Sequence, residues 1–402
     1  MSQSGALVRR SRYRELQGWA KRGTKVANRE RNPWVVLSVL LVGFFMTLLD
    51  TTIVNIAIPD MTKSLNGSLD QVLWFVNAYT LVYAGFQLLA GRLGDRFGPR
   101  NMFIAGLALF TLASAACGMA GTPGQMIVLR AVQGLGAAAL MPQTLALISS
   151  VFPAHRRGAA FGVWSAVASL AILAGPTVGG VLVSSLGWRW IFFINVPLGV
   201  LAVAGAFAVV PNMQSSRRSR LDLPGVLLST IGLFLVVFGA IEGQRYQWGR
   251  VWSFLTIPVI LVAGALVLGA FLLVQRVRQE CDPLLPFQLL GNKVFSVSIM
   301  LAWAVMFAGI GMILPLTIYL QSVLGMSAVA AGLVLAPPAL LSLLLSPIAG
   351  NLVQKVGGRA LLLPGLALYS AGRSTRWRCG TCRRRWPVPR RESCLLPASW
   401  AL

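Results

Sequence analysis

Charged side chains are scarce in this chain. They make up 11% of its 402 residues, whereas 56% of the residues are hydrophobic. Soluble domains carry roughly 25% charged residues. So low a charged fraction excludes a soluble protein with a polar coat, and we expect lipid to surround most of the surface.

Histidine and the common catalytic motifs are nearly absent as well. The single histidine is His155, and neither HExxH nor GxSxG occurs, so we do not expect an enzyme. The phosphate-binding loop GxxxxGK[ST] is also missing, which excludes ATP as the energy source. We expect no cofactor.

Cysteines are few and form no framework. Cys379 and Cys382 have the spacing of a metal-binding pair, but only Cys394 follows them. A structural zinc site needs four ligands. The pattern therefore predicts neither a metal site nor disulfides.

Basic residues, in contrast, are abundant, and the formal net charge is +24. Such a charge raises the question of nucleic-acid binding. Here, however, Lys and Arg occur in short bursts between long apolar runs, and no basic stripe alternates with aromatic residues that could stack on bases. We expect no nucleic-acid partner.

Ten apolar stretches have the roughly 20 residues that a membrane-spanning helix needs. They predict an all-α, polytopic integral membrane protein, and an eleventh stretch begins at Ala360 but fails near Gly372. The ten stretches are 34–58, 72–91, 101–121, 125–148, 158–184, 190–211, 223–241, 252–274, 294–320 and 328–350.

The connections between these stretches alternate in charge, and short cytoplasmic loops are the ones that collect Lys and Arg. This rule places the N-terminus in the cytoplasm, with residues 1–33 as a basic arm that lacks the apolar core of a signal peptide. The predicted cytoplasmic loops hold Arg92, Arg96, Arg100, Arg156, Arg157, Arg217, Arg218, Arg220, Arg276, Arg278, Lys293, Lys355 and Arg359, and the opposite loops hold only Lys63, Arg189, Arg245 and Arg250.

An internal repeat relates two of the cytoplasmic loops. The segment GRLGDRFGPR at 91–100 aligns without gaps to GNLVQKVGGR at 350–359. Transporters built from two halves related by an axis along the membrane normal would give this arrangement. Chance similarity between two glycine-rich basic turns is the alternative.

Four motifs together carry a family resemblance. They are LLDTTIVNIAIP at 48–59, GRLGDRFGPR at 91–100, LRAVQGLGAAALMP at 129–142, and AGPTVGG at 174–180 followed by WRWIFFINVP. Over roughly residues 34–371 the chain resembles the major facilitator superfamily, specifically its fourteen-helix drug/proton antiporter family.

This resemblance implies a major facilitator fold with a complete N-terminal six-helix bundle, two extra helices and an incomplete C-terminal bundle. The corresponding parts are 1–33 for the basic arm, 34–211 for the six-helix bundle, 212–275 for a cytoplasmic loop and the two extra helices, 276–371 for the incomplete bundle and 372–402 for an aberrant tail.

Asp50 and Arg130 are the only ionisable residues that the predicted spans place deep in the membrane, where a charge is costly and is usually functional or paired. At 1.5 Å per residue they lie at similar depths, roughly 12 and 8 Å from the same edge. The resemblance implies that they couple transport to protons. A static buried ion pair between the first and fourth helices is the alternative.

The loop at 91–100 has a different predicted task. In the family, a loop of this type bridges the two halves and stabilises the state closed on the inside, which the resemblance assigns to Gly91, Asp95, Arg96, Gly98 and Arg100. The two arginines also fit a simpler role as topology anchors. In the family this loop acts partly against the start of helix eleven. Here Gln354 replaces the Asp of the second copy and the eleventh apolar stretch fails, so the latch lacks its partner.

Small residues mark two further helices. In the fifth predicted helix they lie four apart, which lets helices approach closely, and Pro176 predicts a bend. The resemblance assigns Gly175, Pro176, Gly179 and Gly180 to the helix-five motif of antiporters, and Gln133 and Gly134 to the helix-four motif. Aromatic residues such as Trp74, Tyr79 and Trp164 could line a pocket, although aromatic residues gather at membrane interfaces in any case.

The composition changes abruptly after Gly372, where the chain becomes rich in Arg, Trp, Cys and Pro without an apolar run. We interpret residues 372–402 as the result of a lost reading frame or a C-terminal truncation. The alternative function that follows is a non-transporting remnant, because alternating access needs two halves.

The function favoured by the sequence is proton-coupled export of drugs or other small lipophilic or cationic molecules across the inner, or plasma, membrane. The expected partners are the small-molecule substrate, protons and membrane lipid, while the identity of any periplasmic adaptor is unknown. The sequence does not specify the substrate, because such pockets select by shape and apolar character rather than by a fixed motif.

Overall fold

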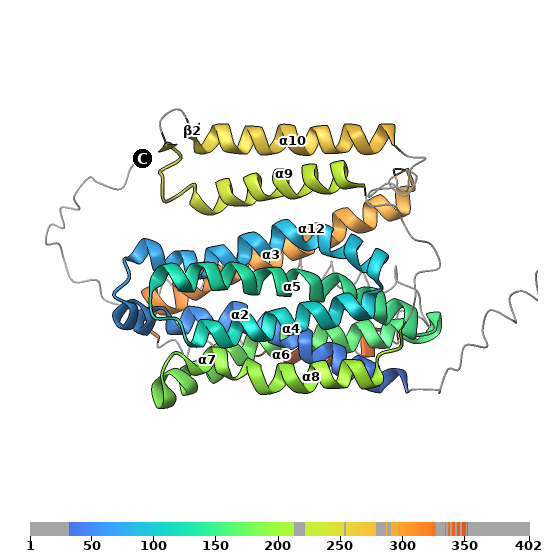
Figure 1. Cartoon of the computed structure of the whole chain (residues 1–402), viewed down its shortest axis with the longest axis horizontal. Helices are drawn as coiled ribbons and strands as arrows, with labels where there is room; N and C mark the ends of the chain where they lie inside the picture. The colour runs from blue at the N-terminus through green and yellow to red at the C-terminus, as the bar shows by residue number, and fades with distance from the viewer. Residues whose placement is uncertain are drawn as a thin grey trace, which may run out of the picture. The chain divides into compact units, whose positions relative to one another are not determined.

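The computed structural model describes residues 32–212, 222–252, 255–278, 287 and 291–326, with scattered positions up to 352. Nearly all of this part is helical (Figure 1). The helices are α2 (Pro33–Leu65), α3 (Leu69–Phe97), α4 (Pro99–Gly118), α5 (Pro123–Val151), α6 (Ala154–Leu186), α7 (Trp190–Phe193), α8 (Asn195–Val209), α9 (Leu223–Glu242), α10 (Ile257–Val277), α12 (Lys293–Ile318) and the π-helix η1 (Tyr319–Val323).

Several predicted features lie outside the described residues. They are the basic arm at 1–31, the arginine-rich loop at 213–221, most of the predicted span at 328–350, nearly all of the second repeat copy at 350–359, and the tail at 372–402.

Polar caps explain where several helices begin. The first backbone N–H groups of a helix have no partner within the helix, and a side-chain oxygen just before it satisfies one of them. Asn32 accepts from Trp34 N at the start of α2. Before α3, Ser68 and Gln71 form a reciprocal capping box. Three later helices also begin after a side-chain cap: Thr122 precedes α5, Asp222 precedes α9 and Thr256 precedes α10.

Eight of the described helical segments are long and apolar enough to cross a membrane, and α7 and α8 count as one of them. The predicted all-α class is therefore confirmed for this part of the chain. The break between α7 and α8 falls at Ile194, three residues before Pro197. A proline lacks the N–H that would bond the carbonyl four residues earlier, which accounts for the interruption.

The predicted span at 252–274 begins too early. Residues Arg250–Trp252 (β1) and Leu255–Thr256 (β2) form a short antiparallel pair, and α10 starts only at Ile257. Thr256 accepts from Val259 N, and Pro258 occupies the first turn, where its missing N–H costs nothing. The apolar residues before Ile257 extend the hydrophobic run without extending the helix.

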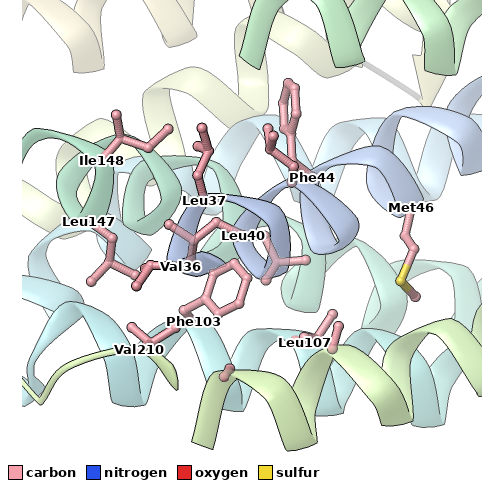
Figure 2. Packing of buried hydrophobic residues seen from close by; sticks show 14 of the residues in the cluster. Val36, Leu37, Leu40, Phe44, Met46, Phe103, Leu107, Leu147, Ile148 and Val210 are labelled. Carbon is pink, nitrogen blue, oxygen red and sulfur yellow. The ribbon is translucent and has the colours of Figure 1, made fainter. Parts of the chain in front are cut away.

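Helix α2 packs against α3, α5, α6, α7 and α8. Figure 2 shows one buried cluster in which Leu37, Leu40 and Phe44 of α2 meet Phe103 of α4 and Leu147 of α5. Because lipid tails are as apolar as these side chains, close van der Waals packing rather than transfer from water must hold such helices together.

Small residues allow a close approach between α4 and α5. A Cβ atom added to Gly136 would lie 2.6 Å from Phe110 N and 2.8 Å from Gly106 O, and both of these are backbone atoms that cannot move aside. Gly106 in turn faces Ala139 across the same interface. This contact sets the spacing between α4 and α5.

We therefore expect Gly136→Ala to destabilise the protein, even though alanine favours a helix more than glycine does. The forced separation of α4 and α5 should lower the free energy of unfolding by about 1–3 kcal/mol. The measurement is the thermal unfolding midpoint of the purified protein in detergent. Gly124→Ala on the same helix is the control, because nothing lies within 4 Å of its added Cβ. A midpoint that rises in both variants would contradict the account.

Candidate functional site

A buried ion pair joins α2 to α5. Asp50 lies near the middle of α2, and Arg130 lies about two turns into α5. Arg130 Nη1 donates to Asp50 Oδ2 at 2.6 Å. Both side chains are 0% exposed. Two residues that the sequence places at similar depth are thus in direct contact.

Gln133 is the third member of this network. Its Oε1 accepts from Arg130 Nη1 at 2.7 Å, and its Nε2 donates to Asp50 Oδ1 at 3.0 Å. Arg130 and Gln133 are three residues apart on α5, which places them on the same face of the helix. Both carboxylate oxygens of Asp50 therefore accept a hydrogen bond from α5.

Helix α3 holds the guanidinium group from another side. Arg130 Nε donates to Phe75 O at 2.9 Å, and the guanidinium carbon lies 4.3 Å from the centre of the Tyr79 ring. A cation over an aromatic face is stabilised by the ring's negative quadrupole, more so away from water. Tyr79 Oη also donates to Thr47 O of α2 at 3.4 Å, so Tyr79 connects α3 to α2 beside the ion pair.

One nitrogen of the guanidinium group, Arg130 Nη2, has no hydrogen-bond partner among the described residues. An unsatisfied buried donor costs free energy. Burying the ion pair itself also costs desolvation that its attraction repays only in good geometry. The network is therefore not explained by stability alone.

Glycines bring two other helices close to this network. A Cβ on Gly134, next to Gln133, would lie 2.7 Å from Tyr79 O, so Gly134 permits the contact of α5 with α3. Added Cβ atoms on Gly175 and Gly179 of α6 would collide with Thr52 and Ile53, within one turn of Asp50 on α2. The predicted close approach of the helix-five motif is confirmed at these two positions.

The other two residues of that motif differ. Gly180 has nothing within 4 Å of an added Cβ, so it takes no part in this contact. Pro176 lies inside α6, which continues past it to Leu186.

The loop at 91–100 is almost entirely helical. Gly91, Asp95 and Arg96 belong to the end of α3, and Gly98 alone separates α3 from α4. Its φ of 91° lies in the left-handed region that glycine adopts without strain. Gly98 therefore has a backbone reason to be glycine.

The charged residues of this segment find partners near the same end of the bundle. Asp95, which is 60% exposed, lies 3.7 Å from Arg92. Arg100 Nη2 donates to Phe207 O of α8 at 2.7 Å, and the Arg96 guanidinium lies over the Phe97 ring. Within the described residues, the ion-pair partner of Asp95 is therefore an arginine of its own helix.

The structure thus brings Asp50, Arg130 and Gln133 together and places the helix-five motif beside them. The residues of the 91–100 segment form a separate group with partners on α3 and α8. The segment's expected partner at the start of the eleventh predicted helix lies outside the part of the chain that the structure describes.

Sequence reasoning missed some of the residues involved. Glu242 at the end of α9 is 2% exposed, although it was not counted among the buried ionisable groups. Its position directly after an apolar run is the sequence signal that could have indicated its burial. The support of Arg130 by Phe75 O and the Tyr79 ring had no sequence signal. Within the described residues, no group of three or more His, Cys, Asp or Glu could hold a metal ion.

Comparisons with known proteins identify the family. The model for the Major Facilitator Superfamily matches residues 40–372. The chain is 43% identical to an uncharacterized MFS-type transporter of Mycobacterium tuberculosis, over 81% of this chain and 55% of that protein. It is 36% identical to the multidrug resistance protein Stp of the same species (82% and 60%) and 34% identical to the tetracenomycin C resistance and export protein of Streptomyces glaucescens (84% and 62%).

The chain spans only about 55 to 62% of the length of these relatives. Among solved structures, the proton:xylose symporter XylE bound to 6-bromo-6-deoxy-D-glucose has a TM-score of 0.54 at 16% identity, covering 81% of this chain and 70% of that one. This likeness concerns the fold alone, and it agrees with the predicted major facilitator fold. With the family match, it makes the chain a multi-pass membrane protein that belongs to the Major Facilitator Superfamily.

Proposed function

We propose that the protein is a secondary active transporter that exports small lipophilic or cationic molecules in exchange for protons. The observation that carries this proposal is the fully buried network of Asp50, Arg130 and Gln133. A carboxylate kept inside a membrane bundle with a single cation and an amide is suited to bind and release a proton, since intramembrane ionisable residues commonly form proton relays.

The network gives protonation a structural consequence. Asp50 accepts hydrogen bonds on both oxygens while it is ionised. A proton on either oxygen removes the charge and one acceptor position, so the attachment of α2 to α5 weakens. Because both side chains are 0% exposed here, a proton can reach Asp50 only after the surrounding helices separate. Proton exchange is thereby tied to a change of conformation.

Asp50, rather than Arg130, carries the proton in this proposal. A guanidinium group keeps its charge in proteins. Arg130 also has anchors that do not depend on Asp50, namely Phe75 O and the Tyr79 ring. Arg130 therefore stays in place while Asp50 binds or releases a proton.

The relatives support export as the direction. Two of them are named as a multidrug resistance protein and as a resistance and export protein. Resistance by transport requires outward movement of the compound. We extend this direction to the present chain. We also assign the chain to the fourteen-helix drug/proton antiporters, with α9 and α10 as the two extra helices.

We further propose roles for the remaining motifs. The close contact of Gly175 and Gly179 with α2 would transmit movement at Asp50 to α6. The segment with Asp95, Arg96 and Arg100 would stabilise the state closed on its own side of the membrane. The charge alternation of the loops supports a cytoplasmic N-terminus and a plasma-membrane location.

Replacing the carboxylate should abolish the coupling. We expect Asp50→Asn to reduce uncoupler-sensitive efflux of a fluorescent lipophilic cation to the level of cells without the protein, because asparagine cannot exchange a proton. Asp60→Asn is the matched control, since Asp60 is exposed and lies on the same helix. The measurement is dye efflux with and without a protonophore.

Full uncoupler-sensitive efflux in Asp50→Asn would rule out Asp50 as the coupling residue. If cells that make the unmodified protein retain as much dye as cells without it, the non-transporting remnant would be favoured instead.

A second experiment separates coupling from a purely structural pair. Arg130→Met leaves the Asp50 carboxylate buried without a cation, and we expect it to lower the free energy of unfolding by about 3–5 kcal/mol. The double variant Asp50→Asn/Arg130→Met should recover much of this loss, because it removes both charges. Thermal unfolding in detergent measures the recovery.

The double variant should nevertheless fail to export the dye, since the carboxylate that carries the proton in this mechanism is gone. If export returned together with stability, the ion pair would be only structural and the proposed mechanism would be wrong.

A further inference from the structure

A second polar cluster ties the end of α9 to α3. Arg245 Nη1 donates to Glu242 Oε2 and Arg245 Nη2 donates to Asp70 Oδ2, both at 3.1 Å. The amide of Asn77 reaches the other oxygen of Glu242 at 3.5 Å. Glu242 is 2% exposed, whereas Asp70 is 57% exposed. One arginine thus bridges a buried carboxylate at the end of α9 and an exposed one at the start of α3.

Apolar contacts continue along the same two helices. The rings of Trp74 on α3 and Phe238 on α9 lie 6.1 Å apart. Farther along, a Cβ added to Gly85 would lie 3.9 Å from Phe234 Cβ and 4.0 Å from Thr230 O. From Asp70 to Gly85 the contact covers roughly 22 Å of α3, at 1.5 Å per residue. This interface is too long for a single incidental contact.

Helices α9 and α10 are themselves tightly joined, and they lie side by side in Figure 1. Glycines provide the close approach from both sides. Added Cβ atoms would lie 2.8 Å from Leu268 for Gly232, 2.7 Å from Leu261 for Gly239 and 2.8 Å from Val236 for Gly264. Small residues at such positions let helix backbones pack closely in a membrane.

The other end of this hairpin has its own polar contact. Asp222, the cap of α9, accepts from Gln275 Nε2 and lies 3.6 Å from Arg278 at the end of α10. The hairpin formed by α9 and α10 is therefore fastened internally at its open end and attached to α3 at its turn.

From these contacts we propose that the α9–α10 hairpin is a rigid extension of the bundle α2–α8, held to α3 by Arg245 and by the contact around Gly85. During transport the hairpin moves together with α3. The movement that opens and closes the substrate path takes place between this combined body and the rest of the chain. The proposed function does not require this, because two extra helices could equally slide or hinge against the bundle.

A disulfide between α3 and α9 tests the proposal. In a background in which all five native cysteines are replaced by alanine, Gly85→Cys and Phe234→Cys would place two Cβ atoms about 3.9 Å apart. That separation lies inside the range of about 3.5–4.5 Å that disulfides adopt. Gly85→Cys with Gly269→Cys is the matched control, because Gly269 on α10 has nothing within 4 Å of its added Cβ.

We expect the 85/234 pair to cross-link in membranes under mild oxidation and the 85/269 pair to remain reduced. Dye efflux by the oxidised 85/234 protein should stay within about twofold of its reduced form, since the bond joins two parts of one body. Arg245→Gln in the same background should slow cross-linking roughly fivefold, because Glu242 then loses its cation.

Three results would overturn the proposal. They are no cross-link in the 85/234 pair, efflux that is lost on oxidation and restored by a reductant, and a cross-linking rate that Arg245→Gln leaves unchanged. If the unmodified protein exports no dye, the proposed function fails by itself. The cross-linking yield and its dependence on Arg245 then decide the attachment of the hairpin.

Discussion

The whole arrangement depends on one charged contact inside an apolar bundle, that between Asp50 of α2 and Arg130 of α5. Neither side chain is exposed, and water is therefore not available to solvate either charge. The surrounding structure supplies the missing solvation through Gln133, the Phe75 carbonyl and the Tyr79 ring. A charge introduced without these partners would cost several kcal/mol. The site thus constrains three helices at once, which a pair kept only for stability would not need.

The packing around the site follows from the lipid that surrounds the bundle. In lipid, apolar side chains gain little by leaving the solvent, so helices associate through close contact and hydrogen bonds. Glycine provides that closeness where α5 meets α4, where α6 meets α2 and where α9 meets α10. At the contact of α6 with α2, the glycines meet residues within one turn of Asp50. Rigid helix pairs around one polar network favour movement of whole bodies over local rearrangement.

For most of the helices that the structure describes, the sequence predicted their positions. It also predicted the pairing of Asp50 with Arg130, because rise per residue fixes the depth of a side chain along a spanning helix. It could not predict rotation about the helix axis, so the partners of Arg130 on α3 were not foreseen. Glu242 was missed because a carboxylate at the end of an apolar run resembles an exposed loop residue. The start of α10 was placed too early for a related reason: hydropathy does not distinguish β1 and β2 from helix, whereas the cap at Thr256 does.

The most direct test of the central claim is infrared difference spectroscopy of the purified protein in lipid, which detects the carbonyl band of a protonated carboxyl group. When the pH is lowered, a protonated carboxyl band should appear that is missing in Asp50→Asn and retained in Asp60→Asn. It should reverse when the pH is raised. A spectrum in which Asp50→Asn changes nothing would mean that Asp50 does not exchange a proton, and would contradict the account.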